Sequence, residues 1–220
     1  MNHWVNKDTE IYCSFAENAG NTGCQMMNTA FHYHRLNKIY KSFSVDSIEA
    51  AVTAVRTLNI KGFAITMPYK VDVLKYVDEM SNDVKQIGAA NTVMNRDGIL
   101  SAYNTDAYAA KTYLDRYDNR KTLYIIGNGG YAKAVKSAAI EWKMSIRSIS
   151  IESITRKNFN DIGDIRDSIV YNCTPIDIES SVDKSNDFIN CLVTTNTGKE
   201  LATLQASKQY RMYTGLEFPF

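Results

Sequence analysis

The feature that most constrains how this chain can fold is a glycine turn between an apolar strand pattern and a helix pattern. Residues 122–127 read TLYIIG, the turn continues as NGGYA, and the next segment places Val135, Ala138 and Trp142 on one helical face. Glycines there let the backbone bend tightly and approach a pyrophosphate, and the helix N-terminus supplies free N–H groups. This context predicts a nucleotide-binding βαβ unit, with a plain tight turn as the alternative.

Selectivity for the ribose is expected at the end of the next predicted strand, IRSISIE. Glu152 follows the glycine turn near the ~20-residue offset of a ribose-binding acid, which favours NAD. Arg156 and Lys157 lie close by and could instead take the 2′-phosphate of NADP, and Glu152 could equally be a solvated strand end. The predicted cofactor-binding residues are Gly127, Asn128, Gly129, Gly130, Tyr131, Glu152, Arg156 and Thr174.

The first half of the chain alternates strand and helix patterns. Three apolar stretches read as strands: 11–15, 39–45 and 62–66. A helix pattern begins near Gln25, and a second begins at Asp46, with Glu49 completing a capping box. This alternation predicts an α/β layer with parallel pairing of its strands.

The middle of the chain contains a predicted hairpin and a domain boundary. Residues 71–80 and 81–88 both have helical patterns, and Asp97-Gly98 then separates two apolar runs, which is a strong hairpin signal. A helix is predicted from about Thr105 to Tyr117, and the polar stretch DRYDNRK that follows marks the boundary.

The predicted fold class is therefore α/β, with two domains. Residues 1–117 form the first predicted domain. Residues 118–199 form a Rossmann-type dinucleotide-binding domain, because the glycine turn and two further apolar stretches, SIVYNCT and FINCLVT, belong to it.

Composition and charge exclude several classes of protein. The net charge is +1 with dispersed basic residues, which is unlike a nucleic-acid-binding surface. No apolar run approaches the ~20 residues of a membrane span, and residues 1–10 lack the regions of a signal peptide, so a cytoplasmic protein is expected. Four cysteines without a C-x-x-C pair, and His32 and His34 only two residues apart, indicate no metal site.

A lysine follows the third predicted strand at an unusual place. Residues 61–70, KGFAITMPYK, read as a buried strand that is stopped by Pro68 and followed by Lys70. Alone, such a lysine is usually a solvated surface residue, and Asp106 in YNTDAY is more often a helix cap. Together, near strand ends and beside Asn91, the two suit acid–base transfer of a hydroxyl proton.

Five motifs of the chain resemble, in order, those of shikimate dehydrogenases. They are GFAITMPYK, IGAANTV, YNTDAY, GNGGYAKAV and LQASKQYRMYTG, and they match G-F-N-V-T-x-P-x-K, I-G-A-x-N-T, G-x-N-T-D, G-x-G-G-x-x-x-A and Q-A-x-x-Q-F-x-x-W-T-G. More narrowly, the chain resembles the divergent shikimate dehydrogenase-like branch. The resemblance covers nearly the whole chain. It implies that residues 1–117 are a substrate-binding domain completed by residues 200–220, whose C-terminal helix packs back on it.

The resemblance also implies roles for individual residues. Lys70 and Asp106 would be catalytic, flanking the substrate hydroxyl and helping to transfer its proton while the nicotinamide takes the hydride. Asn91 and Gln205 would hydrogen-bond the substrate, and Thr66 would be a further residue of the substrate pocket.

Several positions depart from the family pattern. Asn21 and Gly23 are the expected substrate-binding residues where the family has two serines that grip the substrate carboxylate, and Ala64 replaces the asparagine of N-V-T. Fewer donors should weaken the binding of a carboxylate. The family's N-R-T, whose arginine holds the 2′-phosphate, is replaced by residues 153–155, and the cofactor domain is shorter than usual.

The resemblance implies an NAD(P)-dependent oxidoreductase that interconverts 3-dehydroshikimate and shikimate, a step of chorismate and aromatic amino acid biosynthesis, or acts on a related acid such as quinate. NADP is the expected cofactor, with NAD possible, and a monomer or homodimer would bind a small-molecule substrate. A second hypothesis is a regulatory protein that binds a metabolite or nucleotide on the same scaffold with little or no dehydrogenase activity. A third is a related Rossmann enzyme that reduces another carbonyl.

Overall fold

The computed structural model describes residues 5–118, 120–146, 151–154 and 161–220. The chain divides into two compact units: unit 1 is Met1–Thr105 with Ala206–Phe220, and unit 2 is Asp106–Gln205. The helix after Thr105 was predicted to belong to the first domain, whereas α4 (Thr105–Leu114) groups almost entirely with unit 2. Its buried Ala110 and Leu114 belong to the hydrophobic core of that unit.

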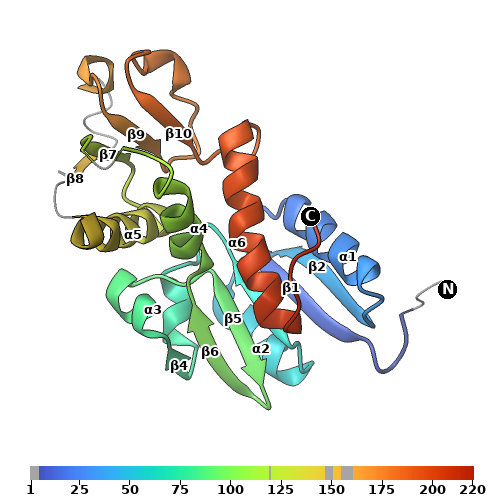
Figure 1. Cartoon of the computed structure of the whole chain (residues 1–220). Coiled ribbons are helices and arrows are strands. Elements are labelled where there is room, and N and C mark those ends of the chain that lie inside the picture. The colour runs from blue at the N-terminus through green and yellow to red at the C-terminus, as the bar shows by residue number, and fades with distance from the viewer. Residues whose placement is uncertain (1–4, 119, 147–150, 155–160) are drawn as a thin grey trace. The chain divides into compact units, whose positions relative to one another are not determined.

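Unit 1 is built on a six-stranded mixed sheet in the order β2-β1-β3-β5-β6-β4 (Figure 1). The strands are β1 (Glu10–Ala16), β2 (Lys38–Ser44), β3 (Gly62–Ile65), β4 (Glu79–Met80), β5 (Thr92–Arg96) and β6 (Ile99–Tyr103). β1 pairs in parallel with β2 and β3, as the alternation predicted, and β5 and β6 form the predicted hairpin. Asp97 and Gly98 form its turn with φ of +52° and +90°, which suits a two-residue hairpin turn.

Helices cover both faces of this sheet because alternate strand residues point to opposite sides. Cys13, Phe15 and Phe63 lie in one core with α2 (Ile48–Thr57). Tyr12 and Tyr40 lie in a second core, which also contains side chains of α1 (Thr22–Tyr33) and the last turns of α6 (Asn196–Thr214). The C-terminal helix therefore packs on the substrate-side unit, as the resemblance implied.

Two local predictions in unit 1 are wrong. The N-cap of α2 is Ser47, whose hydroxyl accepts from Ala50 N, so the helix does not start from a capping box of Asp46 and Glu49. Residues 71–80 do not form an α-helix. They form a short 3₁₀ helix, η1 (Asp72–Lys75), and then β4, because Glu79 and Met80 pair with strand β6. The helix predicted over 81–88 is α3 (Asn82–Ile87).

Asp78, just before β4, makes the stability of unit 1 depend on pH. Its carboxylate accepts a hydrogen bond from Leu100 N at 2.7 Å. Each carboxylate oxygen also accepts from the Arg56 guanidinium, at 2.9 and 3.0 Å. The Leu100 hydrogen bond and the Arg56 guanidinium hold the pKa of Asp78 below its ordinary value. The ionised form therefore stabilises the fold at neutral pH, and this contribution is lost as the pH falls through the folded-state pKa.

We expect Asp78→Asn to cost about 1 kcal/mol at pH 7, discounted for the partial exposure of the pair. The gap to wild type should narrow as the pH falls through the folded-state pKa of Asp78, which lies below its ordinary value, because the wild-type carboxyl then loses its charge. Urea unfolding at pH 7, 5 and 3 measures this, with Asp115→Asn as an exposed control. A gap that stays constant across this range would contradict the prediction.

Unit 2 is built on a four-stranded parallel sheet in the order β10-β9-β7-β8. The strands are β7 (Leu123–Ile126), β8 (Ile151–Ile154), β9 (Ile169–Asn172) and β10 (Asp187–Asn190). Helices α4 and α5 (Gly130–Ile146) contribute to the core on one face, which includes Trp142. In the connection from β9 to β10 the structure has the short 3₁₀ helix η3 (Glu179–Ser181) and no α-helix, consistent with a shortened domain.

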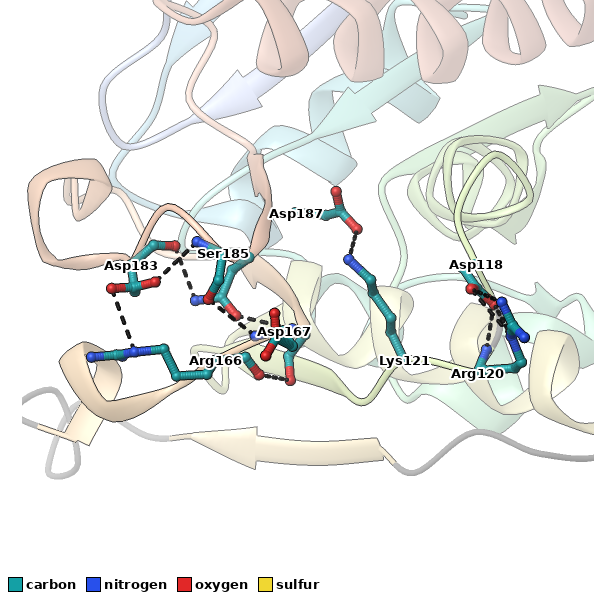
Figure 2. Close-up of polar contacts among 10 residues, drawn as sticks. Asp118, Arg120, Lys121, Arg166, Asp167, Asp183, Ser185 and Asp187 are labelled. Atoms are coloured by element: carbon teal, nitrogen blue, oxygen red, sulfur yellow. Dashed lines mark hydrogen bonds and ion pairs between the residues drawn. The ribbon is translucent and has the colours of Figure 1, made fainter.

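Charged side chains gather where the strands of unit 2 begin (Figure 2). Lys121, before β7, binds Asp187 at the start of β10 at 2.8 Å, and Arg166 lies 3.4 Å from Asp183. Ser185 N donates to Asp183 Oδ1 at 2.9 Å, and the Ser185 hydroxyl accepts from Asp167 N at 3.1 Å. These contacts lie at the amino ends of the strands, whereas the glycine turn follows the carboxyl end of β7. Among the described residues no helix is long and apolar enough to cross a membrane.

Candidate active site

Asn91 is the centre of a buried polar network at the start of β5. Its Oδ1 accepts from Thr105 N at 2.8 Å and from Thr92 Oγ1 at 2.9 Å, and its Nδ2 donates to Thr105 Oγ1 at 2.9 Å. All three side chains are buried. A buried amide is expensive unless it is hydrogen-bonded, and here the bonds also fix the orientation of Asn91. The structure therefore places the predicted substrate residue Asn91 in a rigid setting.

Lys70 ends the turn that follows β3. Its carbonyl oxygen accepts from Ala90 N at 2.8 Å, which ties the turn to the residue before Asn91. Thr66, at the start of this turn, is exposed, and its backbone N donates to Phe15 O at 3.1 Å. Lys70 is half-buried, unlike a fully solvated surface lysine.

Asp106 is the second residue of α4 and is buried, with 5% of its surface exposed. It follows Thr105, whose backbone N and hydroxyl both bond Asn91, so the start of the helix is anchored at that point. An acid in the first turn of a helix is favoured by the helix dipole. Within unit 2, the charge of Asp106 also contributes to the raised pKa of Tyr131, for which burial is the main cause.

Asn21 and Gly23 lie at the N-terminus of α1. Asn21 is the N-cap, but its side chain makes no capping hydrogen bond. A Cβ on Gly23 would have only the Tyr40 ring and hydroxyl within 4 Å, both at 3.9 Å, which is ordinary contact. A serine side chain therefore has room at position 23.

Two glutamines of α6 lie four residues apart and therefore on one face of the helix. Gln205, the predicted substrate residue, is half-buried and donates to Ala202 O at 3.2 Å. Gln209 is buried, with 2% of its surface exposed, and donates to Thr92 Oγ1 at 2.8 Å. Gln209 was not among the predicted site residues, although its four-residue spacing from Gln205 was a usable signal.

The glycine turn follows β7 in unit 2, where the strand order reverses between β7 and β9. Ligands of open parallel sheets bind at the carboxyl ends of the strands at such a switch point. Gly127 has φ +122°, and a Cβ there would lie 3.3 Å from Thr174 Cγ2 and 3.4 Å from the Cys173 backbone. The structure thus brings together two predicted cofactor residues, Gly127 and Thr174, and explains why the first must be glycine.

The remaining residues of the turn leave the backbone accessible. Asn128 and Gly129 are exposed, a Cβ on Gly129 would meet nothing within 4 Å, and Gly130 begins α5. Open backbone at the N-terminus of a 17-residue helix fits a pyrophosphate, which needs close N–H donors. These residues therefore fit a dinucleotide.

Tyr131 and Thr174 make their own internal contacts. The hydroxyls of Tyr131 and Tyr171 lie 3.0 Å apart, and burial raises the pKa of both well above the ordinary value. Both hydroxyls therefore stay neutral at physiological pH. Thr174 Oγ1 donates to Asn172 Oδ1 at 2.8 Å, so this hydroxyl shapes the loop after β9.

The residues expected to select the ribose are only partly described. Glu152 lies in β8, where its backbone is in register with Tyr124 of β7. Arg156 and Lys157 lie outside the described residues. In the part of the chain that the structure describes, no cluster of three or more His, Cys, Asp or Glu side chains could hold a metal ion.

Known proteins resemble this chain along most of its length. Residues 22–93 match the family described as the shikimate dehydrogenase substrate binding domain. A shikimate dehydrogenase-like protein of Haemophilus influenzae is 38% identical over 136 residues, which are 61% of this chain and 50% of the relative. A shikimate dehydrogenase (NADP(+)) of Clostridium beijerinckii is 33% identical over 182 residues, which are 74% of this chain and 67% of the relative.

Solved structures agree with these matches. A shikimate 5-dehydrogenase-like protein superposes with a TM-score of 0.80 at 25% identity, covering 97% of this chain and 94% of the other. The shikimate dehydrogenase of Aquifex aeolicus superposes with a TM-score of 0.82 at 18% identity, covering 98% and 96%, and it supports the fold alone. The sequence match spans about half the length of the Haemophilus relative and two thirds of the Clostridium relative. With the five ordered motifs, these matches show that the chain belongs to the shikimate dehydrogenase family.

Proposed function

We propose that this chain is an NADP-dependent dehydrogenase that interconverts 3-dehydroshikimate and shikimate, or acts on a related cyclic hydroxy acid such as quinate. The observation that carries the proposal is the hydrogen-bond network of Asn91. This network anchors the start of α4, next to Asp106. Ala90, the residue before Asn91, donates its backbone N–H to the carbonyl oxygen of Lys70. The names of the relatives, shikimate dehydrogenase (NADP(+)), support the same reaction and cofactor.

In the proposed mechanism, oxidation of the substrate alcohol releases a hydride and a proton. Lys70 and Asp106 receive or return that proton at the substrate oxygen, as positioned acid–base groups do. Asn91, Gln205 and Thr66 orient the substrate. NADP, when bound, supplies the nicotinamide that accepts the hydride.

The glycine turn at Gly127–Gly130 would hold the cofactor pyrophosphate, with Tyr131 and Thr174 shaping the loops on either side. Glu152 and Arg156 are the proposed residues for the ribose and its phosphate. NAD is the alternative cofactor, and the oligomeric state, monomer or homodimer, is part of the same proposal.

The test is an absorbance assay of NAD(P)H formation by the purified chain. Shikimate and quinate are each supplied with NADP and with NAD. Turnover in any well supports the proposal and identifies the substrate and cofactor together. A folded protein that binds NADP, measured by its thermal stabilisation, yet is inactive in all four wells would overturn the dehydrogenase function and favour the regulatory hypothesis.

The glycine at position 23, where the family has a serine, leads to a prediction about substrate binding. In Gly23→Ser, a hydroxyl is restored at the N-terminus of α1, where the Cβ has room. A hydrogen bond to a carboxylate contributes about 1.5–3 kcal/mol, so we expect the KM for shikimate to fall about tenfold or more while kcat stays within about twofold.

Steady-state kinetics of wild type, Gly23→Ser and Gly23→Ala measures this effect. Gly23→Ala is the matched control, since it adds the Cβ without the hydroxyl. Equal KM values for the serine and alanine variants would show that position 23 does not reach the carboxylate.

A further inference from the structure

Gln209 is buried and aimed at the centre of the Asn91 network, yet it is separate from the predicted substrate residues. Its Nε2 donates to Thr92 Oγ1 at 2.8 Å. Thr92 Oγ1 in turn lies 2.9 Å from Asn91 Oδ1 and 3.3 Å from Thr105 Oγ1. All of these residues belong to unit 1.

The hydrogens in this chain of contacts can be assigned by the capacity of each group. Gln209 Nε2 can only donate, so Thr92 accepts from it and has its single hydroxyl hydrogen left to give. The shorter contact directs that hydrogen to Asn91 Oδ1, which also accepts from Thr105 N at 2.8 Å. These two donors, with the Thr105 hydroxyl at 3.2 Å as a longer third contact, hold the oxygen end of the Asn91 amide in place.

With its oxygen fixed, the nitrogen end of Asn91 can have only one orientation. Nδ2 carries two hydrogens, and one of them goes to Thr105 Oγ1 at 2.9 Å. In the described part of the chain this is the single acceptor of Nδ2, so the second hydrogen is available to an oxygen of a bound substrate.

We propose that Gln209 is a positioning residue that acts through the Thr92 hydroxyl to hold the Asn91 amide with its NH₂ group directed to the substrate. The inference rests on the proposed function. It extends that function by naming the relay that sets the hydrogen-bond polarity of Asn91, and it assigns the C-terminal helix a part in substrate recognition.

The matched variants are Gln209→Glu and Thr92→Val. A glutamate side chain has the same shape, but its carboxylate only accepts. The Thr92 hydroxyl would then donate its hydrogen to the carboxylate at position 209, and Asn91 Oδ1 would face an oxygen lone pair of Thr92 instead of a hydrogen. Thr92→Val removes the hydroxyl entirely, whereas Thr92→Ser keeps it.

We expect the KM for shikimate to rise about tenfold in Gln209→Glu and Thr92→Val, with the KM for NADP unchanged and kcat changed far less. Thr92→Ser should restore the wild-type KM. Gln86→Glu and Thr57→Val, both at exposed positions of unit 1, are the controls and should behave as wild type. If Gln209→Glu does not fold, Gln209→Met removes the donor at similar size.

A second readout does not depend on turnover. The Asn91 side-chain NH₂ pair is assigned in the ¹⁵N NMR spectrum by its loss in Asn91→Asp. We expect this pair to shift in Gln209→Glu or Gln209→Met and in Thr92→Val but not in Thr92→Ser. Unchanged signals and an unchanged shikimate KM in the folded variants would overturn the relay. If wild type lacks turnover, the proposed function fails, and the NMR comparison still decides whether Gln209 positions Asn91.

Discussion

Lys70→Ala is expected to lower kcat by roughly 10²–10⁴-fold, the loss that follows removal of a positioned acid–base group. The substitution should leave the fold intact, because the backbone hydrogen bond from Ala90 N to Lys70 O, which ties this turn to the sheet, is kept in the variant. The KM for NADP should also be unchanged, since the proposed cofactor residues lie in the glycine turn. The measurement is steady-state kinetics with the substrate and cofactor that the four-well assay identifies.

Lys75→Ala is the control for this prediction. Lys75 lies five positions further on, is exposed, and pairs with Asp72 at 2.7 Å. Exposed pairs of this kind contribute little, so this variant should retain wild-type kcat and stability. A wild-type kcat in Lys70→Ala would mean that Lys70 is an ordinary surface lysine, and the acid–base proposal would fail.

Asp106→Asn extends the same argument. If Lys70 and Asp106 act on one proton, the losses of kcat in the two single variants should not combine in full in the double variant. The double variant Lys70→Ala with Asp106→Asn should then be only slightly slower than the worse single variant. Fully multiplicative losses would indicate that the two residues assist separate steps.

Short-range signals predicted the parts of the fold where backbone conformation depends on one or two residues. Asp97-Gly98 predicted the β5–β6 hairpin, and both residues have the positive φ that the turn requires. Gly127 predicted the nucleotide-type turn, and it has a positive φ and tight surroundings, in which a Cβ would lie 3.3 Å from Thr174 Cγ2. In these places the local chemistry and the tertiary structure require the same residue.

Residues 71–80 show where local pattern was insufficient. Their apolar spacing is compatible with a helix, but Glu79 and Met80 pair with Ser101 and Ala102, far away in the sequence. Asp78 adds a carboxylate hydrogen bond to Leu100 N at 2.7 Å. Such long-range pairing outweighs helix propensities of a few tenths of a kcal/mol per residue, and a single sequence contains no direct signal for it.

The residues of the candidate site also differ in whether the sequence alone could identify them. Asn91 could be predicted because its motif is recognisable. Its partners are Thr92 and Thr105, and Thr92 is in turn bonded by Gln209; the three come from separate elements, and only the fold shows that they meet. Helical spacing placed Gln209 on the face of Gln205, yet spacing could not show which glutamine bonds Thr92. Motifs thus singled out Asn91 as a proposed substrate residue, whereas the residues that orient it depended on tertiary packing.

Gly198→Ala is expected to destabilise unit 2 by roughly 3 kcal/mol or more, the upper range for an added group in a packed interior. Gly198 is buried in the first turn of α6. A Cβ there would lie 1.9 Å from Leu192 O and 2.3 Å from the Leu192 carbonyl carbon. Contacts this short must be relieved by moving backbone.

The backbone at Leu192 cannot move without losing hydrogen bonds. Leu192 O accepts from Thr195 N at 2.9 Å and from Thr195 Oγ1 at 2.7 Å, and Leu192 N donates to Asn190 Oδ1 at 3.2 Å. Relief of the clash therefore breaks part of this loop or displaces the start of α6. Either change costs stability, whereas the helix propensity of alanine returns only about 1 kcal/mol.

Urea unfolding followed by the fluorescence of Trp142 measures the effect in unit 2, because this side chain is buried in its core. Trp4 is replaced by Phe in all proteins compared, so that Trp142 is the only tryptophan. Gly163→Ala is the control, since its Cβ would meet only Ser181 O at 3.9 Å. A midpoint for Gly198→Ala equal to that of the control would show that the loop after β10 accommodates a side chain, and the close approach of α6 to Leu192 would not be a constraint on the fold.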